Sequence, residues 1–315
     1  MNEASQLAGM TTDPVRQALR TPLPVERKGT LLDWVFLLVP GTIWGTSFLF
    51  IAEGLEAVGP NGVTFTRIAV GFLTLLCVPA SRRPIPTEAW PRIAVLSVVW
   101  MAFPLTLFPF AEQRVTSALT GMLNGASPLF VALVASFLAR KAPSRSVLSG
   151  LAVGLAGAFL VALPSLHEGG NSLVGVLMII TALASYGVAY NLARPLQMKY
   201  GAIPVLTRAL GLAVVLTAPL GVPEVLHGRW SLWPLLSLLA LGALGTGVAF
   251  VIASIAAGRL GATRGSATTF IIPPVALMLG VVIRHERVDA VSILGAAVCL
   301  AGAMLMRRAQ DHASR

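Results

Sequence analysis

The second half of this chain repeats the first at an offset of about 144 residues. The matches keep one order, and their offsets vary only between 141 and 146, which indicates an internal duplication. Each half contains five apolar segments, and an odd number places the two halves in opposite orientations across a membrane. The matching positions are 43–45 and 185–187, Thr66-Arg67 and Thr207-Arg208, Arg114 and Arg259, Pro128 and Pro274, and 155–158 and 300–303.

The composition is that of an integral membrane protein. Hydrophobic residues make up 56% of the chain and charged residues 11%, against about 45–50% and about 25% in soluble domains. Stretches of about 20 apolar residues cross a bilayer as helices, because lipid offers the backbone no other hydrogen-bond partner. The sequence therefore predicts an all-α integral membrane protein with ten transmembrane helices, arranged as two inverted five-helix repeats. The expected spans are 33–53, 61–80, 92–111, 117–138, 147–165, 173–193, 202–222, 233–256, 263–283 and 289–306.

The positive charges indicate the orientation. If the N-terminus is cytoplasmic, 17 of the 23 Lys and Arg residues lie in cytoplasmic segments, which is the usual bias. We therefore interpret the net charge of +10 as a topology signal and expect no nucleic-acid partner. The expected location is a bacterial-type plasma (inner) membrane, with both termini on its cytoplasmic side. The expected organisation is a disordered cytoplasmic tail at 1–32, repeat 1 at 33–166, repeat 2 at 167–306 and a cytoplasmic C-terminal tail at 307–315.

Few ionisable side chains lie at membrane depth. All 13 Asp and Glu residues and all 4 His residues lie in tails, loops or helix ends, and Glu53 and Glu112 come closest to the membrane interior. A membrane enzyme or metal centre needs a nucleophile, base or ligand set at depth. We therefore expect no catalytic residues, no metal and no cofactor, and we expect Cys77 and Cys299 to be filler in apolar spans.

Arg67 and Arg208 are the exceptions, since each lies six or seven residues into its expected helix. A buried arginine costs about 2.5–3.5 kcal/mol at a helix centre, which makes both functional candidates. Either the guanidinium binds a substrate carboxylate, or it holds helix ends and carbonyls together at a gate. The second interpretation is favoured because both copies keep the arginine.

Polar and aromatic side chains at depth predict a substrate cavity. Trp44 lies too deep for an interfacial anchor, and aromatic faces beside hydroxyl groups suit a small amphipathic solute. Proline removes a backbone donor, so the proline-containing spans are expected to kink and to face protein or a wet cavity. Core packing remains an equal alternative for each residue. The cavity candidates are Trp44, Ser47, Phe48, Asn124, Ser127, Tyr186, Tyr190, Thr268 and Thr269, and the expected kinks are at Pro128, Pro273 and Pro274.

Small residues recur every four positions in the fifth expected span (Gly150, Gly154, Ala158), and their counterparts do so in the tenth. Such faces let helices approach closely. Packing between these two helices of one monomer is favoured over a dimer interface, so the chain is expected to be a monomer or a homodimer.

These residues resemble the EamA family of the drug/metabolite transporter superfamily over about 33–306. The resemblance rests on Ile-Trp-Gly-Thr-Ser-Phe at 43–48, Thr-Arg in the second span, and Arg-His-Glu-Arg-Val at 284–288. It implies ten helices, a cavity lined mainly by the first, third, fourth, sixth, eighth and ninth, and export of amino acids or related metabolites. Glu286 matches the acidic residue that closes the ninth helix. The first copy departs from the family at Arg140-Lys141, where Gly-Glu is usual, and we therefore interpret Glu286 as a helix-end or loop contact rather than a coupling site.

The leading hypothesis is a secondary transporter that exports amino acids or related small metabolites by alternating access through a central cavity. The expected partners are a small-molecule substrate and the lipid bilayer. The alternatives are a multidrug or other metabolite carrier, including uptake, a membrane-embedded enzyme, and a non-transporting assembly or sensor subunit.

Overall fold

The computed structural model describes residues 31–140, 144–167, 170–256 and 266–313. Helices dominate this part of the chain and it contains no β-strand, which confirms the all-helical expectation. The expected tail up to residue 30, the basic residues Arg259 and Arg264, and the start of the ninth expected span lie outside the described residues.

The helices follow one another with short connections. Several consecutive elements form one rod: a π-helical segment lies inside each of Thr87–Glu112 and Leu232–Ala256, and a 3-10 turn begins each of Thr87–Glu112 and Thr268–Val282. The elements are α2 (Leu31–Gly54), α3 (Pro60–Leu76), η3 (Pro79–Arg82), η4 (Thr87–Ala89), α4 (Trp90–Leu96), η5 (Ser97–Ala102), α5 (Phe103–Glu112), α6 (Ser117–Asn124), α7 (Ser127–Ala139), α8 (Arg145–His167), α9 (Gly170–Tyr200), α10 (Ala202–Leu226), α11 (Leu232–Ala240), η6 (Leu241–Val248), η7 (Ser266–Ile271), α13 (Ile272–Val282) and α14 (Ala290–Ala313).

Six of the described helices are long and apolar enough to cross a membrane, and the bent pair Ser117–Asn124 and Ser127–Leu138 adds a seventh if it is one span. Thr268–Val282 and Ala290–Met306 are apolar but shorter. The chain is therefore a multi-pass membrane protein, while the expected count of ten spans stays a prediction.

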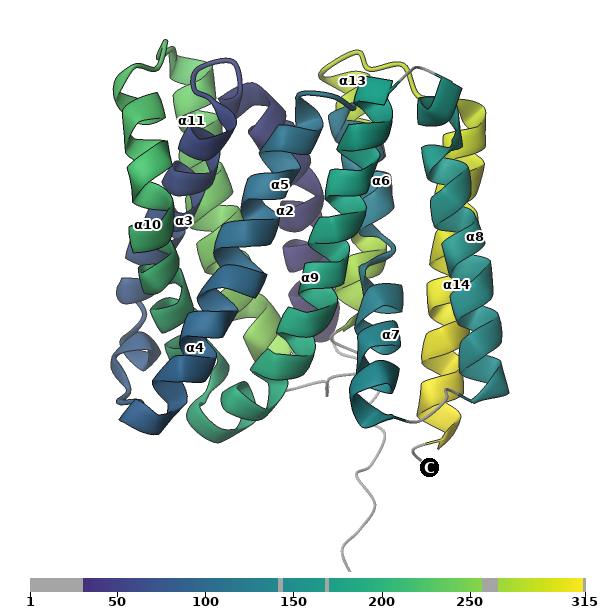
Figure 1. Ribbon diagram of the computed structural model, residues 1–315, viewed down its shortest axis with the longest axis horizontal. Coiled ribbons are helices and arrows are strands. Elements are labelled where there is room, and N and C mark those ends of the chain that lie inside the picture. Colours follow the sequence, from purple (N-terminus) through teal and green to yellow (C-terminus); the bar gives the residue numbers. More distant parts are fainter. Residues whose placement is uncertain (1–30, 141–143, 168–169, 257–265, 314–315) are drawn as a thin grey trace, which may run out of the picture.

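The rods lie side by side in one bundle, with α8 and α14 at one edge and α10 at the other (Figure 1). The main packed pairs are α8 with α14, α3 with α10, α3 with η6, α7 with α9, α6 with α13, and α5 with α9. The loops that precede α6 and α14 lie at the upper end in Figure 1, and the C-terminus lies at the lower end.

Helices α8 and α14 are in backbone contact. A Cβ atom at Gly157 would lie 2.2 Å from the backbone nitrogen of Cys299, and one at Gly302 would lie 2.2 Å from that of Gly154. Only glycine fits such an approach, because real Cβ atoms essentially never come that close. The expected packing of these two small-residue faces within one monomer is thereby confirmed.

The helix α6–α7 is broken, and the break meets a second irregular segment. The two parts are bent by 40°, and the Ser127 hydroxyl bonds the Asn124 carbonyl at 2.6 Å across the break. Pro128 lies in the first turn of α7, and Pro273 and Pro274 lie in the first turn of α13, directly after the 3-10 turn η7. The bend predicted at Pro128 thus lies directly before this residue, and all three prolines occupy the first turn of the helix that follows. Proline suits that position because its missing N–H has no partner there anyway. A Cβ at Gly125 would lie 2.6 Å from Pro273 Cγ, so the two irregular segments touch.

Candidate functional site

Seven aromatic side chains form one continuous series of ring contacts, here called the aromatic chain. Neighbouring ring centroids lie 5.2 to 6.0 Å apart, and four of the six contacts are edge-to-face, the geometry that aromatic rings prefer. The side chains come from α2, η5, α5, α9 and the helix that continues η6. In order of contact they are Phe48, Phe108, Tyr186, Tyr190, Trp100, Phe250 and Trp44.

Four of the predicted residues, Trp44, Phe48, Tyr186 and Tyr190, belong to this chain, so the structure brings them together. The sequence analysis missed the other three. The depth argument applied to Trp44 could have found Trp100, which is buried at 3% exposure well inside the span Thr87–Glu112. Periodicity alone could not have identified these residues, because aromatic residues in apolar helices most often belong to the ordinary core.

Trp44 also connects two helices through its indole group. Its Nε1–H donates to the carbonyl of Gly245 at 2.9 Å. Gly245 lies in the π-helical turn η6, and a second π-helical turn, η5, lies at the corresponding place in the first half. Such turns shift the regular i→i−4 hydrogen-bond ladder and are frequent at functional sites.

The predicted polar residues mostly bond within their own helices. Ser47 donates to the Ile43 carbonyl at 3.1 Å, and Ser127 bonds Asn124. Thr268 is almost fully buried, and its hydroxyl has no hydrogen-bond partner among the described residues, although Thr269 beside it does interact. The Thr268 carbonyl lies against Gly41 of α2, on the helix that carries Trp44.

Arg67 is buried on α3 at 7% exposure. Its Nε donates to the hydroxyl of Thr246 at 3.0 Å, and this is its one hydrogen bond to the described part of the chain. After burial, the groups that affect the electrostatics of Arg67 most are Tyr186 of the aromatic chain and Glu112. The guanidinium therefore keeps two Nη groups without a hydrogen-bonded partner among these residues.

Arg208, the counterpart in the second half, has a different environment. Its Nη1 donates to the carbonyl of Ser81, and its Nη2 donates to that of Arg83 at 3.0 Å. Both carbonyls follow the end of α3, so Arg208 joins α10 to the chain beyond that helix end. This agrees with the interpretation in which the guanidinium holds helix ends and carbonyls together, and not with the one in which it binds a substrate carboxylate.

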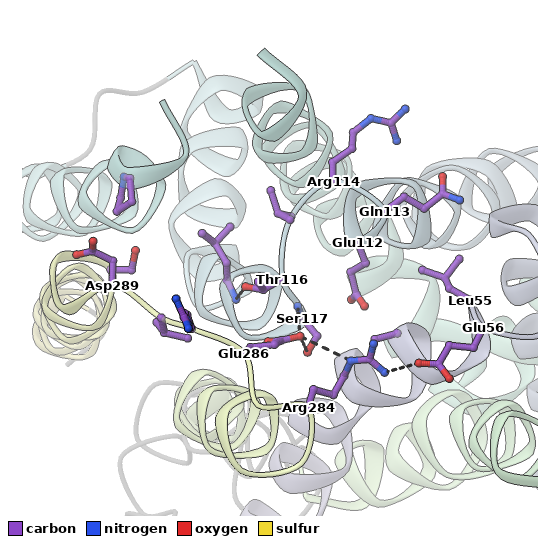
Figure 2. A pocket seen from close by; sticks show the side chains of 17 residues that line it. Leu55, Glu56, Glu112, Gln113, Arg114, Thr116, Ser117, Arg284, Glu286 and Asp289 are labelled. Atoms are coloured by element: carbon purple, nitrogen blue, oxygen red, sulfur yellow. Dashed lines mark hydrogen bonds and ion pairs between the residues drawn. The ribbon is translucent and has the colours of Figure 1, made fainter. Parts of the chain in front are cut away.

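A cavity of about 520 Å³ opens at the upper end of the bundle, where α2, α5, α6 and α13 end or begin (Figure 2). Its wall carries charges of both signs. They include Glu56, Glu112, Arg284, Glu286 and Asp289. Figure 2 shows Glu112 directed toward Ser117 and Arg284, whereas Arg114 points away.

Arg284 holds the acidic end of α2. Its Nη1 bonds Glu53 at 2.5 Å and Glu56 at 3.0 Å, and only 8% of the Glu53 side chain is exposed. Partial burial lowers the pKa of the Arg284 guanidinium, but the hydrogen bonds and charges of the two glutamates outweigh burial, so the pKa is raised. Arg284 therefore stays protonated at physiological pH, and Glu53 and Glu56 keep a positively charged partner.

Two further carboxylates cap helix N-termini. Glu286 accepts from Ser117 N at 3.0 Å, Ser117 Oγ at 2.7 Å and Ala118 N at 2.9 Å, at the start of α6. Glu224 accepts from Asn61 Nδ2 and Gly62 N, both at 2.7 Å, at the start of α3. Carboxylates at these places satisfy free N–H groups and complement the helix dipole. The interpretation of Glu286 as a helix-end contact is confirmed.

Glu112 differs from these four acids. Both of its carboxylate oxygens are buried, and neither has a hydrogen-bond partner within the described ranges. Glu112 interacts electrostatically with Glu286, Arg67 and Arg284, but it forms no ion pair within 4.0 Å with the residues that the structure describes. A buried carboxylate without a partner is costly, so this group invites a cationic or hydrogen-bonding ligand.

Comparison with known proteins shows which family the chain resembles. The model of the EamA-like transporter family matches two segments, residues 33–163 and 173–308. The chain is 26% identical over 281 residues to the "Probable terminal-alkyne amino-acid exporter" of Streptantibioticus cattleyicolor, with 87% of this chain and 93% of the relative covered. It is 29% identical over 225 residues to an S-adenosylmethionine/S-adenosylhomocysteine transporter of Chlamydia trachomatis, with 64% and 65% covered. A protein of known crystal structure shares the fold, with a TM-score of 0.57, 20% identity and 88% and 96% coverage.

Proposed function

Because the chain belongs to the EamA-like transporter family, we propose that it is a secondary transporter that exports amino acids or related small metabolites by alternating access. The proposal includes ten transmembrane helices in two inverted repeats, both termini in the cytoplasm, and a bacterial-type plasma (inner) membrane.

The aromatic chain is the observation that carries the proposal. Trp44, Phe48, Trp100 and Phe108 come from the first family-matched segment, and Tyr186, Tyr190 and Phe250 from the second. A solute beside these rings would contact both halves, so a rocking motion of one half against the other would change its access. Aromatic faces bind the apolar part of such a solute, and neighbouring polar groups orient it.

The pattern of helix packing supports the inverted repeat. Helix α3 packs on its counterpart α10, α8 on its counterpart α14, and α6 on its counterpart α13. One further set of contacts also matches: α2 packs on α13 and α11, while its counterpart α9 packs on α7 and α5. A two-fold relation between the halves would produce this pairing, and inverted repeats that surround a central site are common among secondary transporters.

The names of the relatives support the substrate class. One names an amino-acid exporter and the other a transporter of S-adenosylmethionine, and both solutes contain an α-amino acid group. The aromatic rings favour an apolar side chain, so the proposed substrate is an amino acid with an apolar side chain.

Counterflow in proteoliposomes tests this function. Vesicles preloaded with one solute are diluted into its labelled form, with amino acids, S-adenosylmethionine, nucleosides and sugars compared in parallel. We expect accumulation with apolar amino acids, a strong loss in Trp44→Ala and a weaker one in Asn124→Ala. Trp233→Ala, at an exposed position of α11, serves as the matched control. Counterflow of sugars or nucleosides alone would contradict the substrate class, and no counterflow with any solute would contradict the carrier.

A further inference from the structure

We propose that Arg67 and Glu112 form a two-point site for the charged headgroup of an α-amino acid. In this site the guanidinium of Arg67 binds the carboxylate, and Glu112 accepts hydrogen bonds from the ammonium group. The inference rests on the transport function proposed above and specifies the chemistry by which that function selects its substrate.

Glu112 is the acid in this region that the described protein leaves unsatisfied. Glu53 and Glu56 are paired with Arg284, Glu286 caps α6, and Glu224 caps α3. Glu112 lines the cavity of about 520 Å³, its oxygens are buried, and no hydrogen-bond donor reaches them within the described ranges. A carboxylate only accepts hydrogen bonds, so its complement is a donor, and an ammonium group supplies three.

Arg67 offers the opposite half. Its Nε is held by Thr246 at 3.0 Å, which fixes the plane of the guanidinium. The two Nη groups remain without a hydrogen-bonded partner in the described structure, and paired N–H groups of arginine bind a carboxylate in bidentate fashion. The bond to Thr246 thus orients the guanidinium and leaves its binding edge available.

Arg67 and Glu112 interact electrostatically, yet they form no ion pair within 4.0 Å in the described part of the chain. A zwitterion carries one negative and one positive group a few bonds apart, so it can satisfy both side chains at once. A solute with a single charge satisfies one and leaves the other buried and unpaired, which is costly.

The aromatic chain continues from this pair. Phe108 lies four residues before Glu112 on α5, and therefore one turn away on the same face. It contacts Tyr186, with which Arg67 interacts. A headgroup held by Arg67 and Glu112 would therefore place an apolar side chain against these rings.

The test compares three solutes that share one side chain. L-phenylalanine carries both charges, 2-phenylethylamine lacks the carboxylate, and 3-phenylpropanoate lacks the ammonium group. Their competition for bound radiolabelled L-phenylalanine is measured on purified protein, and if counterflow identifies another amino acid, that compound and its amine and acid are used instead. We expect the wild type to prefer the amino acid over either analogue by about 10- to 100-fold, the value of one charge-assisted hydrogen-bonding partner.

The variants separate the two contacts. Glu112→Gln should lose most of the preference for the amino acid over the deaminated acid and keep the affinity for that acid. Arg67→Gln should lose most of the preference over the amine and keep the affinity for the amine. Arg67→Lys keeps the charge without the planar fork, should show an intermediate loss, and serves if Arg67→Gln does not fold. Glu88→Gln and Arg92→Gln, both exposed, are the matched controls, and Arg208→Gln tests an embedded arginine outside the site.

The outcomes distinguish this site from the transport function. If the wild type carries amino acids but the variants keep its preferences, or lose all three solutes equally, the two-point site is wrong and the transporter stands. The site is also wrong if Glu112→Gln alters only the pH dependence of transport, since Glu112 would then carry a proton. If the wild type carries no amino acid, the proposed substrate fails first.

Discussion

Replacing Gly157 by alanine should separate α8 from α14. The new Cβ would lie 2.2 Å from the backbone nitrogen of Cys299, where ordinary contact begins at 3.4 Å, so the helices must move apart by about 1.2 Å. A backbone nitrogen cannot rotate away as a side chain can. A gap of about 0.5–1 Å already removes about a quarter to a half of the dispersion energy between facing atoms.

Whether Gly157→Ala raises or lowers the stability depends on two opposing effects. Alanine is a better helix former than glycine by about 1 kcal/mol, while overpacking costs about 1–3 kcal/mol. The contact is repeated along the pair, since Cβ atoms at Gly150 and Gly295 would also lie 2.5 Å from backbone nitrogens. A shift at one glycine therefore loosens the others, and we expect a net loss of about 1–2 kcal/mol.

Thermal unfolding in detergent, followed by far-ultraviolet circular dichroism, measures this loss. Ala156→Val adds volume at the neighbouring exposed position of α8 and should change stability by no more than about 0.5 kcal/mol. If Gly157→Ala is as stable as the wild type while Ala156→Val behaves as expected, the two backbones do not touch at this point, and the reasoning is refuted.

Three further predictions concern single contacts. Glu286→Ala leaves Ser117 N, Ser117 Oγ and Ala118 N without their acceptor and should lower the stability by about 1–2 kcal/mol in the same assay, whereas Glu286→Gln should cost less; equal losses would exclude the capping role. Arg140→Gly should stabilise the protein by about 1 kcal/mol and so raise its melting temperature, because Arg140 follows α7 with a left-handed φ of 50°, which glycine adopts without strain; a lower melting temperature would contradict this strain. Trp44→Phe should reduce counterflow less than Trp44→Ala, because it loses the bond to Gly245 but keeps a ring, and identical losses would place the whole effect in that bond.

The sequence predicted the order of the helices well, because apolar runs report membrane depth directly. The expected span 33–53 corresponds to Leu31–Gly54, and 202–222 corresponds to Ala202–Leu226. Helix ends were less predictable. Helix α9 continues to Tyr200, past the expected end at 193, because a helix can continue through polar residues such as Arg194 and Lys199 once it leaves the apolar layer.

The irregular segments required the structure. The π-helical turns η5 and η6 depend on which carbonyl each N–H meets, and side-chain periodicity does not encode that choice. The break between α6 and α7 was anticipated at Pro128, but its contact with Pro273 joins residues far apart in the chain.

The candidate site was partly predictable. Trp44 was identified because it lies too deep for an interfacial anchor, and Tyr186 because it occupies the matching position of the second half; both belong to the aromatic chain. Glu112 was identified as close to the membrane interior, but its lack of a partner could not be foreseen. It depends on Arg284 pairing with Glu53 and Glu56 instead, a choice made by the tertiary structure.

The aromatic chain also gives the protein a built-in optical reporter. Trp44 and Trp100 both contact Phe250, whereas Trp90, Trp230 and Trp233 are 39 to 52% exposed on the outside of the bundle. Indole emission responds to the polarity around the ring, so the emission maximum or intensity of the inner pair would change when a solute binds beside it. With the three exposed tryptophans and Trp34, the sixth in the chain, replaced by phenylalanine, the remaining emission would follow the arrival and departure of a solute without any attached dye.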